Sequence, residues 1–172
     1  MKKYLLVAIL ALVAITAPAQ ISLNEQSEIQ SLEDLSKRMK LGFISFGDTI
    51  ALLYNDLTFG VDGDELGTVR YDVNERNLGL FRIGKYTPYK VMVFAKNWLV
   101  DTFVFCFRDS EKDGLKKKLF ATYGKPFDED NGDCMWIADN VCVMCQHTAG
   151  GYDVAFMQWD ANKPFPYKQR YK

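Results

Sequence analysis

The segment from Trp98 to Phe107 restricts the fold more than any other part of this chain, because it is apolar on both faces of a β-strand. Residues two apart in a strand point to the same side of the sheet. One side carries Trp98, Val100, Val104 and Cys106, and the other carries Leu99, Phe103, Phe105 and Phe107. A strand that is apolar on both sides needs cover on both, so we predict that this segment is the central strand of a sheet.

Several other segments have the composition of strands, because they are rich in β-branched and aromatic residues and most are bounded by Asn, Gly or Pro. They favour a largely antiparallel arrangement, with a meander in the middle of the chain. The segments are Gly42–Phe46, Thr68–Val73, Leu78–Ile83, Lys90–Lys96, Cys134–Ala138, Val141–His147 and Tyr152–Trp159.

Short helices are predicted before and between these strands. Ser31, Asp48 and Ser110 are each placed to cap a helix whose apolar residues recur at three- and four-residue spacing. Gly60 and Gly124 are placed to end the second and third of these helices. The predicted fold is therefore α+β: a single domain with an antiparallel sheet and two or three short helices packed mainly on one face.

The four cysteines suggest disulfide bonds. A two-residue turn at Asp139-Asn140 places Cys134 directly opposite Cys145 on the neighbouring strand. A cross-strand disulfide is one prediction, although the pair falls at a hydrogen-bonded position, where a bridge needs strain or a register shift. Cys106 and Cys142 are the remaining disulfide candidates, and four cysteines allow three ways of forming two bridges.

The two halves of the chain echo each other, since each has a capped helix followed by strands. Phe46-Gly47-Asp48 opens a helix in the first half, and the second half contains Leu119, Tyr123-Gly124-Lys125-Pro126 and Trp136. In these motifs the chain resembles small exported proteins of the beta-lactamase-inhibitor-protein-like type and related outer-membrane assembly lipoproteins. The resemblance implies helix-then-strands units and carries no binding residue over to this chain. The lipid-attachment cysteine of the lipoproteins is absent.

The N-terminus has the three-part layout of a cleaved secretory signal. Met1-Lys2-Lys3 is positively charged, Tyr4 to Ile15 is apolar, and Ala17-Pro18-Ala19 has small residues at the cleavage site. The apolar run is shorter than the roughly 20 residues of a spanning helix, so we expect export to the periplasm or full secretion, with no membrane span. The expected divisions are a signal peptide at 1–19, a flexible leader at 20–30, an α+β domain at 31–160 and a basic, aromatic tail at 161–172.

Charge narrows the range of partners. Removal of the signal would leave 172 − 19 = 153 residues and change the formal net charge from −1 to −1 − 2 = −3. That length fits one domain with a sizeable core. A nearly balanced surface offers no electrostatic footprint for nucleic acid, so we expect a protein or small-ligand partner and leave the oligomeric state open.

Few residues are placed for chemistry. His147 is the only histidine, and Cys145 lies two residues before it on the same strand face, which suggests a cysteine-dependent hydrolase. Yet nothing nominates a group to orient the imidazole. Cys142 and Cys145 have Cys-x-x-Cys spacing but would point to opposite faces of a strand. The acidic segments Asp62–Glu65 and Asp128–Asp133 lack the ligand spacing of a calcium loop, so we expect them to be solvated turns. We therefore expect no cofactor and no metal.

The aromatic residues, 14% of the chain, are the remaining candidates for a binding role. Trp98, Trp136 and Trp159 could stack on a sugar or hold a protein partner if exposed, whereas burial in the core is the simpler expectation for large rings. With little machinery for catalysis, the predicted function is a non-catalytic exported binding or protein-interaction module of unknown ligand. The alternative is a small extracytoplasmic cysteine-dependent hydrolase that uses Cys145 and His147.

Overall fold

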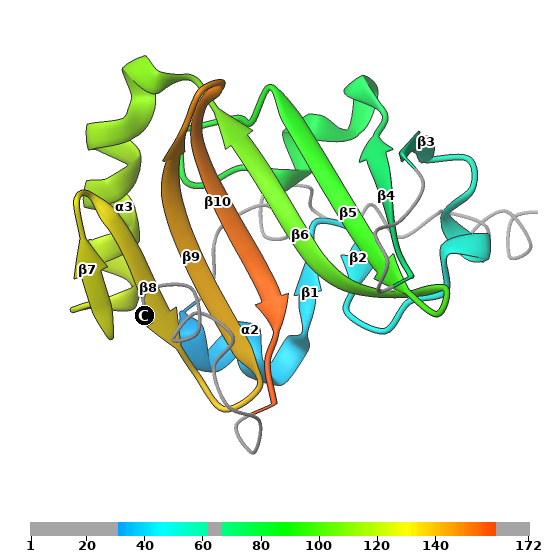
Figure 1. Ribbon diagram of the computed structural model, residues 1–172, viewed down its shortest axis with the longest axis horizontal. Coiled ribbons are helices and arrows are strands. Elements are labelled where there is room, and N and C mark those ends of the chain that lie inside the picture. The colour runs from blue at the N-terminus through cyan, green and yellow to red at the C-terminus, as the bar shows by residue number, and fades with distance from the viewer. Residues whose placement is uncertain (1–30, 62–66, 161–172) are drawn as a thin grey trace, which may run out of the picture.

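The computed structural model describes residues 31–61 and 67–160. The predicted signal peptide, leader and tail lie outside these residues, as does the acidic segment Asp62–Glu65. The described chain forms one α+β domain, in which a large antiparallel sheet is accompanied by a few helices, as the sequence predicts (Figure 1). No helix in these ranges is long and apolar enough to cross a membrane.

The main sheet has eight strands in the order β3-β4-β5-β6-β10-β9-β8-β7. Each half of the chain contributes a four-stranded antiparallel meander, and the two meanders join where β6 pairs with β10. The predicted central strand, β6, is therefore the strand of the first half that pairs with the second half, in the middle of the sheet. The bounds are β3 Leu57–Val61, β4 Thr68–Val73, β5 Lys90–Lys96, β6 Leu99–Phe107, β7 Asp128–Asp130, β8 Asp133–Ile137, β9 Val141–Thr148 and β10 Gly151–Gln158.

The helices are short and begin close to the predicted caps. The Ser31 hydroxyl accepts a 3.1 Å hydrogen bond from the backbone N–H of Asp34, which confirms the first cap. Gly124 ends the long helix with a φ of 76°, a conformation that favours glycine. The remaining elements are α2 Leu32–Arg38, β1 Lys40–Leu41, β2 Ile44–Ser45, η1 Ile50–Leu53, η2 Glu75–Phe81, η3 Asp109–Glu111 and α3 Lys112–Tyr123, where η marks a 3₁₀ helix.

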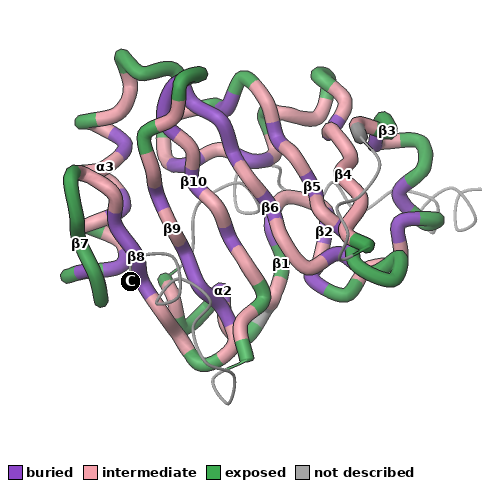
Figure 2. The backbone as a smooth tube through the Cα atoms, viewed as in Figure 1, coloured by how far each residue is buried: buried purple, intermediate pink, exposed green. Residues whose placement is uncertain are grey.

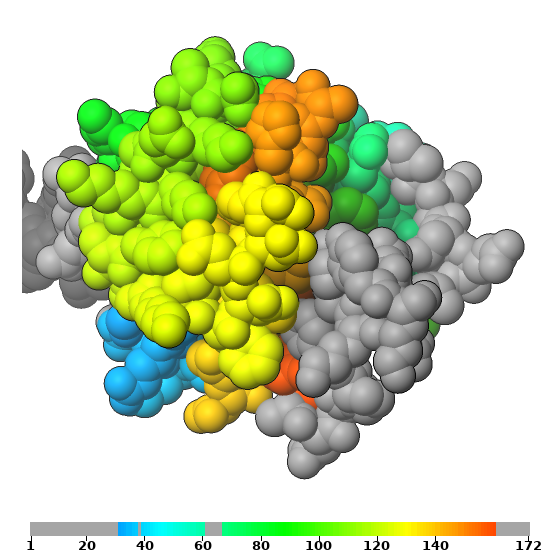
Figure 3. All heavy atoms as spheres, turned by 60° about the vertical axis from the view of Figure 1, so that its left-hand side comes forward, coloured from blue at the N-terminus to red at the C-terminus, as the bar shows by residue number. Residues whose placement is uncertain are grey.

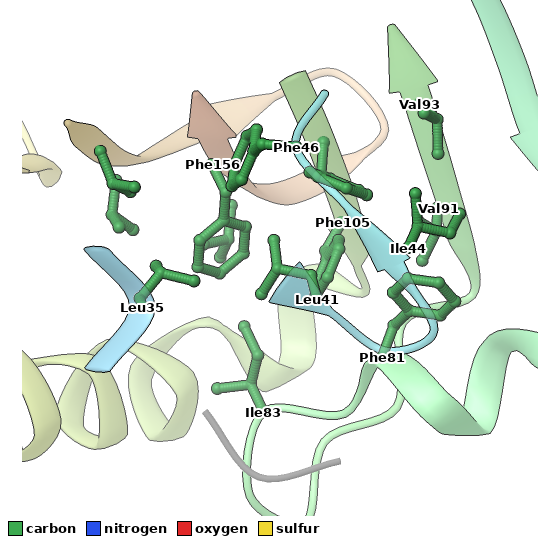
Figure 4. Packing of buried hydrophobic residues seen from close by; sticks show 14 of the residues in the cluster. Leu35, Leu41, Ile44, Phe46, Phe81, Ile83, Val91, Val93, Phe105 and Phe156 are labelled. Carbon is green, nitrogen blue, oxygen red and sulfur yellow. The ribbon is translucent and has the colours of Figure 1, made fainter. Parts of the chain in front are cut away.

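One side of the sheet carries the core. Phe103, Phe105 and Phe107 alternate along β6 and are almost fully buried. Leu35 from α2 and Leu115 from α3 belong to the same cluster, so both α-helices cover this side. Figure 4 shows Leu35 and Leu41 near the rings of Phe156 and Phe105, and Ile44 close to Val91 and Phe81. Figure 2 shows buried positions alternating with less buried ones along the central strands.

The structure corrects two predicted elements. The helix expected from Asp48 to Gly60 is only η1, because Leu57–Val61 instead pairs with β4 as an edge strand. The Asp48 carboxylate accepts a hydrogen bond from the N–H of Ser45, so it closes a turn rather than capping a helix. The strand expected at Leu78–Ile83 is mostly helix η2.

Two smaller differences concern short strands. The candidate Gly42–Phe46 contributes only β2, which pairs with β1 through a turn at Gly42. The acidic segment Asp128–Asp133, expected as solvated turns, begins with β7, whose three acidic residues are exposed at the sheet edge. A charged edge strand of this kind opposes pairing with other chains.

Candidate functional site

Two of the cysteines form a buried pair. Cys134 and Cys145 are Cα partners across β8 and β9, which confirms the predicted register. The hydroxyl of Tyr152 on β10 donates a 2.9 Å hydrogen bond to the Sγ of Cys145. On the outer side, Lys116 of α3 forms a 2.9 Å ion pair with Glu129 of β7, where α3 lies against the β7–β8 hairpin (Figure 3). All four cysteines are free thiols in this structure.

Burial holds these thiols in their protonated form. It raises the pKa of Cys106, Cys142 and Cys145 from 9.0 to about 12, and it also raises the pKa of Cys134. For Cys145 the hydrogen bond from Tyr152 acts in the opposite direction but is the smaller effect. Since the thiolate is the nucleophile, none of the four thiols is activated for covalent chemistry at neutral pH.

The proposed nucleophile and base do not meet. The Nε2 of His147 lies 3.0 Å from a carboxylate oxygen of Asp109, and both side chains are more than half exposed. The backbone N–H of His147 donates to the carboxylate of Asp133. Cys145 is buried and contacts Tyr152 instead. The arrangement thus lacks the hydrogen bond between nucleophile and base that a hydrolase dyad needs.

The other two cysteines are isolated from this pair. The side chain of Cys142 lies on the opposite face of β9 from that of Cys145, as the strand period requires. Cys106 lies on β6, and β10 separates it from β9. Across residues 31–61 and 67–160, no three side chains of His, Cys, Asp or Glu gather as they would to hold a metal ion.

The three tryptophans have different environments. Trp136 is 1% exposed, and its indole Nε1 donates a 3.0 Å hydrogen bond to the carbonyl oxygen of Gly124. Trp159 is partly buried, and its backbone N–H donates to the carbonyl of Asn140. Trp98 is 71% exposed. The core expectation therefore holds for Trp136 and is wrong for Trp98.

The backbone at Trp98 has an unusual conformation. Lys96 pairs with Leu99, so Asn97 and Trp98 are the two central residues of the β5–β6 turn. Their φ angles are 52° and 68°. Two-residue turns with positive φ at both positions favour Asn-Gly, because glycine has no Cβ to clash. A non-glycine residue with this conformation costs about 1–2 kcal/mol, so Trp98 lowers the stability of the turn.

A small pocket opens beside Trp98. It has a volume of about 190 Å³. Tyr71 forms part of its wall from β4, and Val69 and Ala95 pair across β4 and β5 on the side of the sheet that carries the core. None of the described residues that line it is charged. The lining residues are Gly67, Val69, Tyr71, Ala95, Asn97 and Trp98. We call this the Tyr71–Trp98 pocket.

Other exposed apolar side chains come from the segments around this pocket. The Phe59 ring on β3 packs edge-on against Tyr71, with ring centroids 5.9 Å apart. Helix η1 is tied to the same turn, because the N–H of Ile50 donates a 3.0 Å hydrogen bond to the carbonyl of Trp98. These segments lie at the β3–β4 end of the sheet in Figure 1. The exposed members, which we call the apolar end, are Leu52, Tyr54, Phe59, Trp98 and Leu99.

Sequence reasoning missed most of this site. From the sequence, Trp98 is expected at the start of the central strand and as one of three tryptophans, whereas no binding role is predicted for Tyr71, Phe59 or Gly67. The local signal was the pair Asn97-Trp98 between two strand segments, where Asn-Gly is the expected turn. The other residues reach the pocket through the pairing of β4 with its neighbours, for which the sequence has no local signal.

A scan against protein-family models finds no match for this chain, and searches of curated proteins and of solved structures find none either.

Proposed function

We propose that this chain is an exported, non-catalytic protein-interaction module whose partner docks on the apolar end. The observation that carries the proposal is Trp98, a large ring held 71% exposed in a turn conformation that disfavours it. Strained residues that the fold does not require are concentrated at functional sites. Tryptophan and tyrosine also dominate the binding energy of protein interfaces.

The extent of the exposed surface supports a macromolecular partner. Leu52 on η1 and Tyr54 directly after it are each 83% exposed. Phe59 is also exposed, and its ring packs against that of Tyr71 in the pocket wall. Single exposed apolar residues are ordinary, but a group of them drawn from neighbouring elements is typical of an interaction surface. A small ligand held in the pocket would leave most of these side chains in water.

The catalytic alternative has less support. Cys145 is buried as a thiol of raised pKa, and the imidazole of His147 points to Asp109. A hydrolase would need these two side chains to approach each other and the thiol to ionise. No observation in the described part of the chain favours that rearrangement, so we propose binding rather than catalysis.

Export rests on the sequence of the N-terminus, since residues 1–30 are not described. The test is the intact mass of the protein recovered from the extracytoplasmic fraction of the cells that produce it. We expect a mass that begins near Gln20. A chain that retains Met1 or remains in the cytoplasm would remove export from the proposal.

The docking surface is tested by site-specific photocrosslinking in the producing cells. A photoreactive phenylalanine analogue replaces Tyr54 at the apolar end or, as the matched control, exposed Lys117 on α3. We expect a discrete protein adduct from position 54 and none from position 117. Adducts of equal yield at both positions, or none from position 54, would reject the apolar end as the docking surface.

A further inference from the structure

We infer that the Tyr71–Trp98 pocket receives one uncharged, ring-sized apolar side chain of the partner protein. The inference rests on the proposed function and specifies its anchor. Interfaces of this kind depend on a few side chains seated in pockets, with surrounding contacts that exclude water. Here Trp98 and Tyr71 form walls of the pocket, and the other exposed side chains of the apolar end provide the surrounding contacts.

The size of the pocket fits a single side chain. An apolar cavity of about 150 Å³ is large enough to hold a benzene molecule. The volume of about 190 Å³ beside Trp98 therefore accommodates a phenylalanine ring or a leucine side chain, with little space to spare. A longer peptide segment would have to continue beyond the pocket, where Phe59 is exposed beside Tyr71.

The lining selects an uncharged group. None of the six described lining residues carries a charge, and their polar side-chain groups are the Asn97 amide, the Tyr71 hydroxyl and the Trp98 indole N–H. An ammonium or carboxylate that entered would lose hydration without gaining an ion-pair partner among these six residues. An apolar side chain would instead bury its surface against two aromatic rings and the side chains of Val69 and Ala95.

The strain at Trp98 separates a binding role from a structural one. If Trp98 stabilised the fold, its replacement by any small residue would lower the stability of the protein. Trp98 instead occupies a turn position with a φ of 68°, where glycine is unstrained. Trp98→Gly is therefore expected to remove the pocket wall and keep the melting temperature at or above that of the parent protein. Loss of binding without loss of stability is the signature of an anchor residue.

The experiment titrates residues 20–172 with N-acetyl-L-phenylalanine amide and with N-acetyl-L-leucine amide. The readout is the set of indole N–H signals in ¹⁵N-resolved NMR spectra. We expect the Trp98 signal to shift and saturate, while the signal of buried Trp136 stays in place as an internal reference. N-acetyl-L-glutamine amide and methyl glucoside are the comparison probes, and neither is expected to shift the Trp98 signal.

Variants assign the binding to the pocket. Val69→Phe fills the pocket while Trp98 remains, and we expect it to weaken binding of the phenylalanine amide at least tenfold. Trp98→Gly has the same expected effect, followed through the remaining signals of the pocket backbone. The matched control is Phe127→Ala, because Phe127 is also 71% exposed but precedes β7 at the other end of the sheet. We expect that variant to bind as the parent does.

Several outcomes would overturn the inference. They are the absence of any saturable shift, a shift by methyl glucoside in place of the two apolar amides, or a Trp98→Gly variant that loses stability but retains binding. If position 54 forms crosslinks and the apolar amides do not bind, the proposed function stands and the pocket inference fails. If the amides bind and position 54 forms no adduct, the pocket is a small-ligand site and both proposals fail.

Discussion

The Tyr152 hydroxyl donates its proton to the Sγ of Cys145 inside the core, at 2.9 Å. The same hydroxyl oxygen lies 3.3 Å from the carbonyl oxygen of Gly132, in the loop before β8. The hydroxyl of Tyr152 on β10 can therefore donate its one proton either to β9 or to this loop. Tyr152 is fully buried. The hydroxyl therefore serves as a polar tie within an otherwise apolar layer, where an unmade hydrogen bond is costly.

Replacement of Tyr152 by phenylalanine tests this tie. We expect Tyr152→Phe to lower the free energy of unfolding by about 1–2 kcal/mol, because the sulfur and the carbonyl lose a buried donor while the ring remains. The measurement is urea denaturation at pH 7. Tyr89→Phe is the control, since the Tyr89 hydroxyl donates to the Gly150 carbonyl at an exposed position. Equal effects of the two variants would contradict the prediction.

The buried thiols predict a loss of stability in alkali. Burial alone raises the pKa of Cys142 from 9.0 to about 12, so the folded thiol keeps its proton at a pH where the unfolded thiol has lost it. The stabilisation from this thiol is complete below pH 9 and is lost as the pH rises toward 12. Each such thiol lowers the free energy of unfolding by about 1 kcal/mol between pH 8 and pH 10.

Cys142→Ala isolates this effect from the titration of other groups. We expect the decrease in unfolding free energy between pH 8 and pH 10 to be smaller in the variant by about 1 kcal/mol, whatever the variant's stability at pH 7. The measurement is urea denaturation at each pH under reducing conditions. The prediction fails if the two proteins lose stability in parallel.

The parts of the fold that the sequence predicted well are those decided by local pattern. The register of β8 with β9 follows from the turn at Asp139-Asn140 and the two-residue period, and the structure confirms it down to the opposition of Cys134 and Cys145. The faces of β6 were correct from Phe103 to Phe107, because alternation within one strand needs no knowledge of its neighbours. They were wrong at the start of the strand, where a register shift against β5 places Val100 on the core side with Phe103.

The errors arose where distant pairing decides the structure. Leu57–Val61 has apolar residues that suit either a helix or a strand, and its pairing with β4 selects the strand. The candidate site shows the same limit. Trp98 and Asn97 are adjacent in the sequence, but Tyr71 and Gly67 reach the pocket only because β4 lies beside β5. Exposure of Trp98 is likewise a property of the assembled sheet.

The β8–β9 turn also holds α2 in place, which predicts a stability effect for Asn140. Its side-chain amide donates a 3.1 Å hydrogen bond to the backbone carbonyl of Ser36, and its carbonyl oxygen accepts a hydrogen bond from the Ser36 hydroxyl. We expect Asn140→Ala to lower the free energy of unfolding by about 1–2 kcal/mol in thermal or urea denaturation. Exposed Asp139 is the neighbouring control. We expect Asp139→Ala to change the free energy of unfolding by less than about 0.5 kcal/mol.

Gly114 in α3 provides a case in which packing reverses a local rule. Alanine normally stabilises a helix interior relative to glycine by about 1 kcal/mol. At this position, however, a Cβ would clash with the hydroxyl oxygen of Tyr86. We therefore expect Gly114→Ala to lower the free energy of unfolding by about 1–3 kcal/mol, as overpacked sites do. Urea denaturation of the single variants and of Gly114→Ala with Tyr86→Phe completes a double-mutant cycle. Because the clash is mainly with the hydroxyl, the double variant should recover part of the loss.

Strict additivity of the two changes would show that the helix propensity of residue 114, and not its contact with Tyr86, sets the stability at this position.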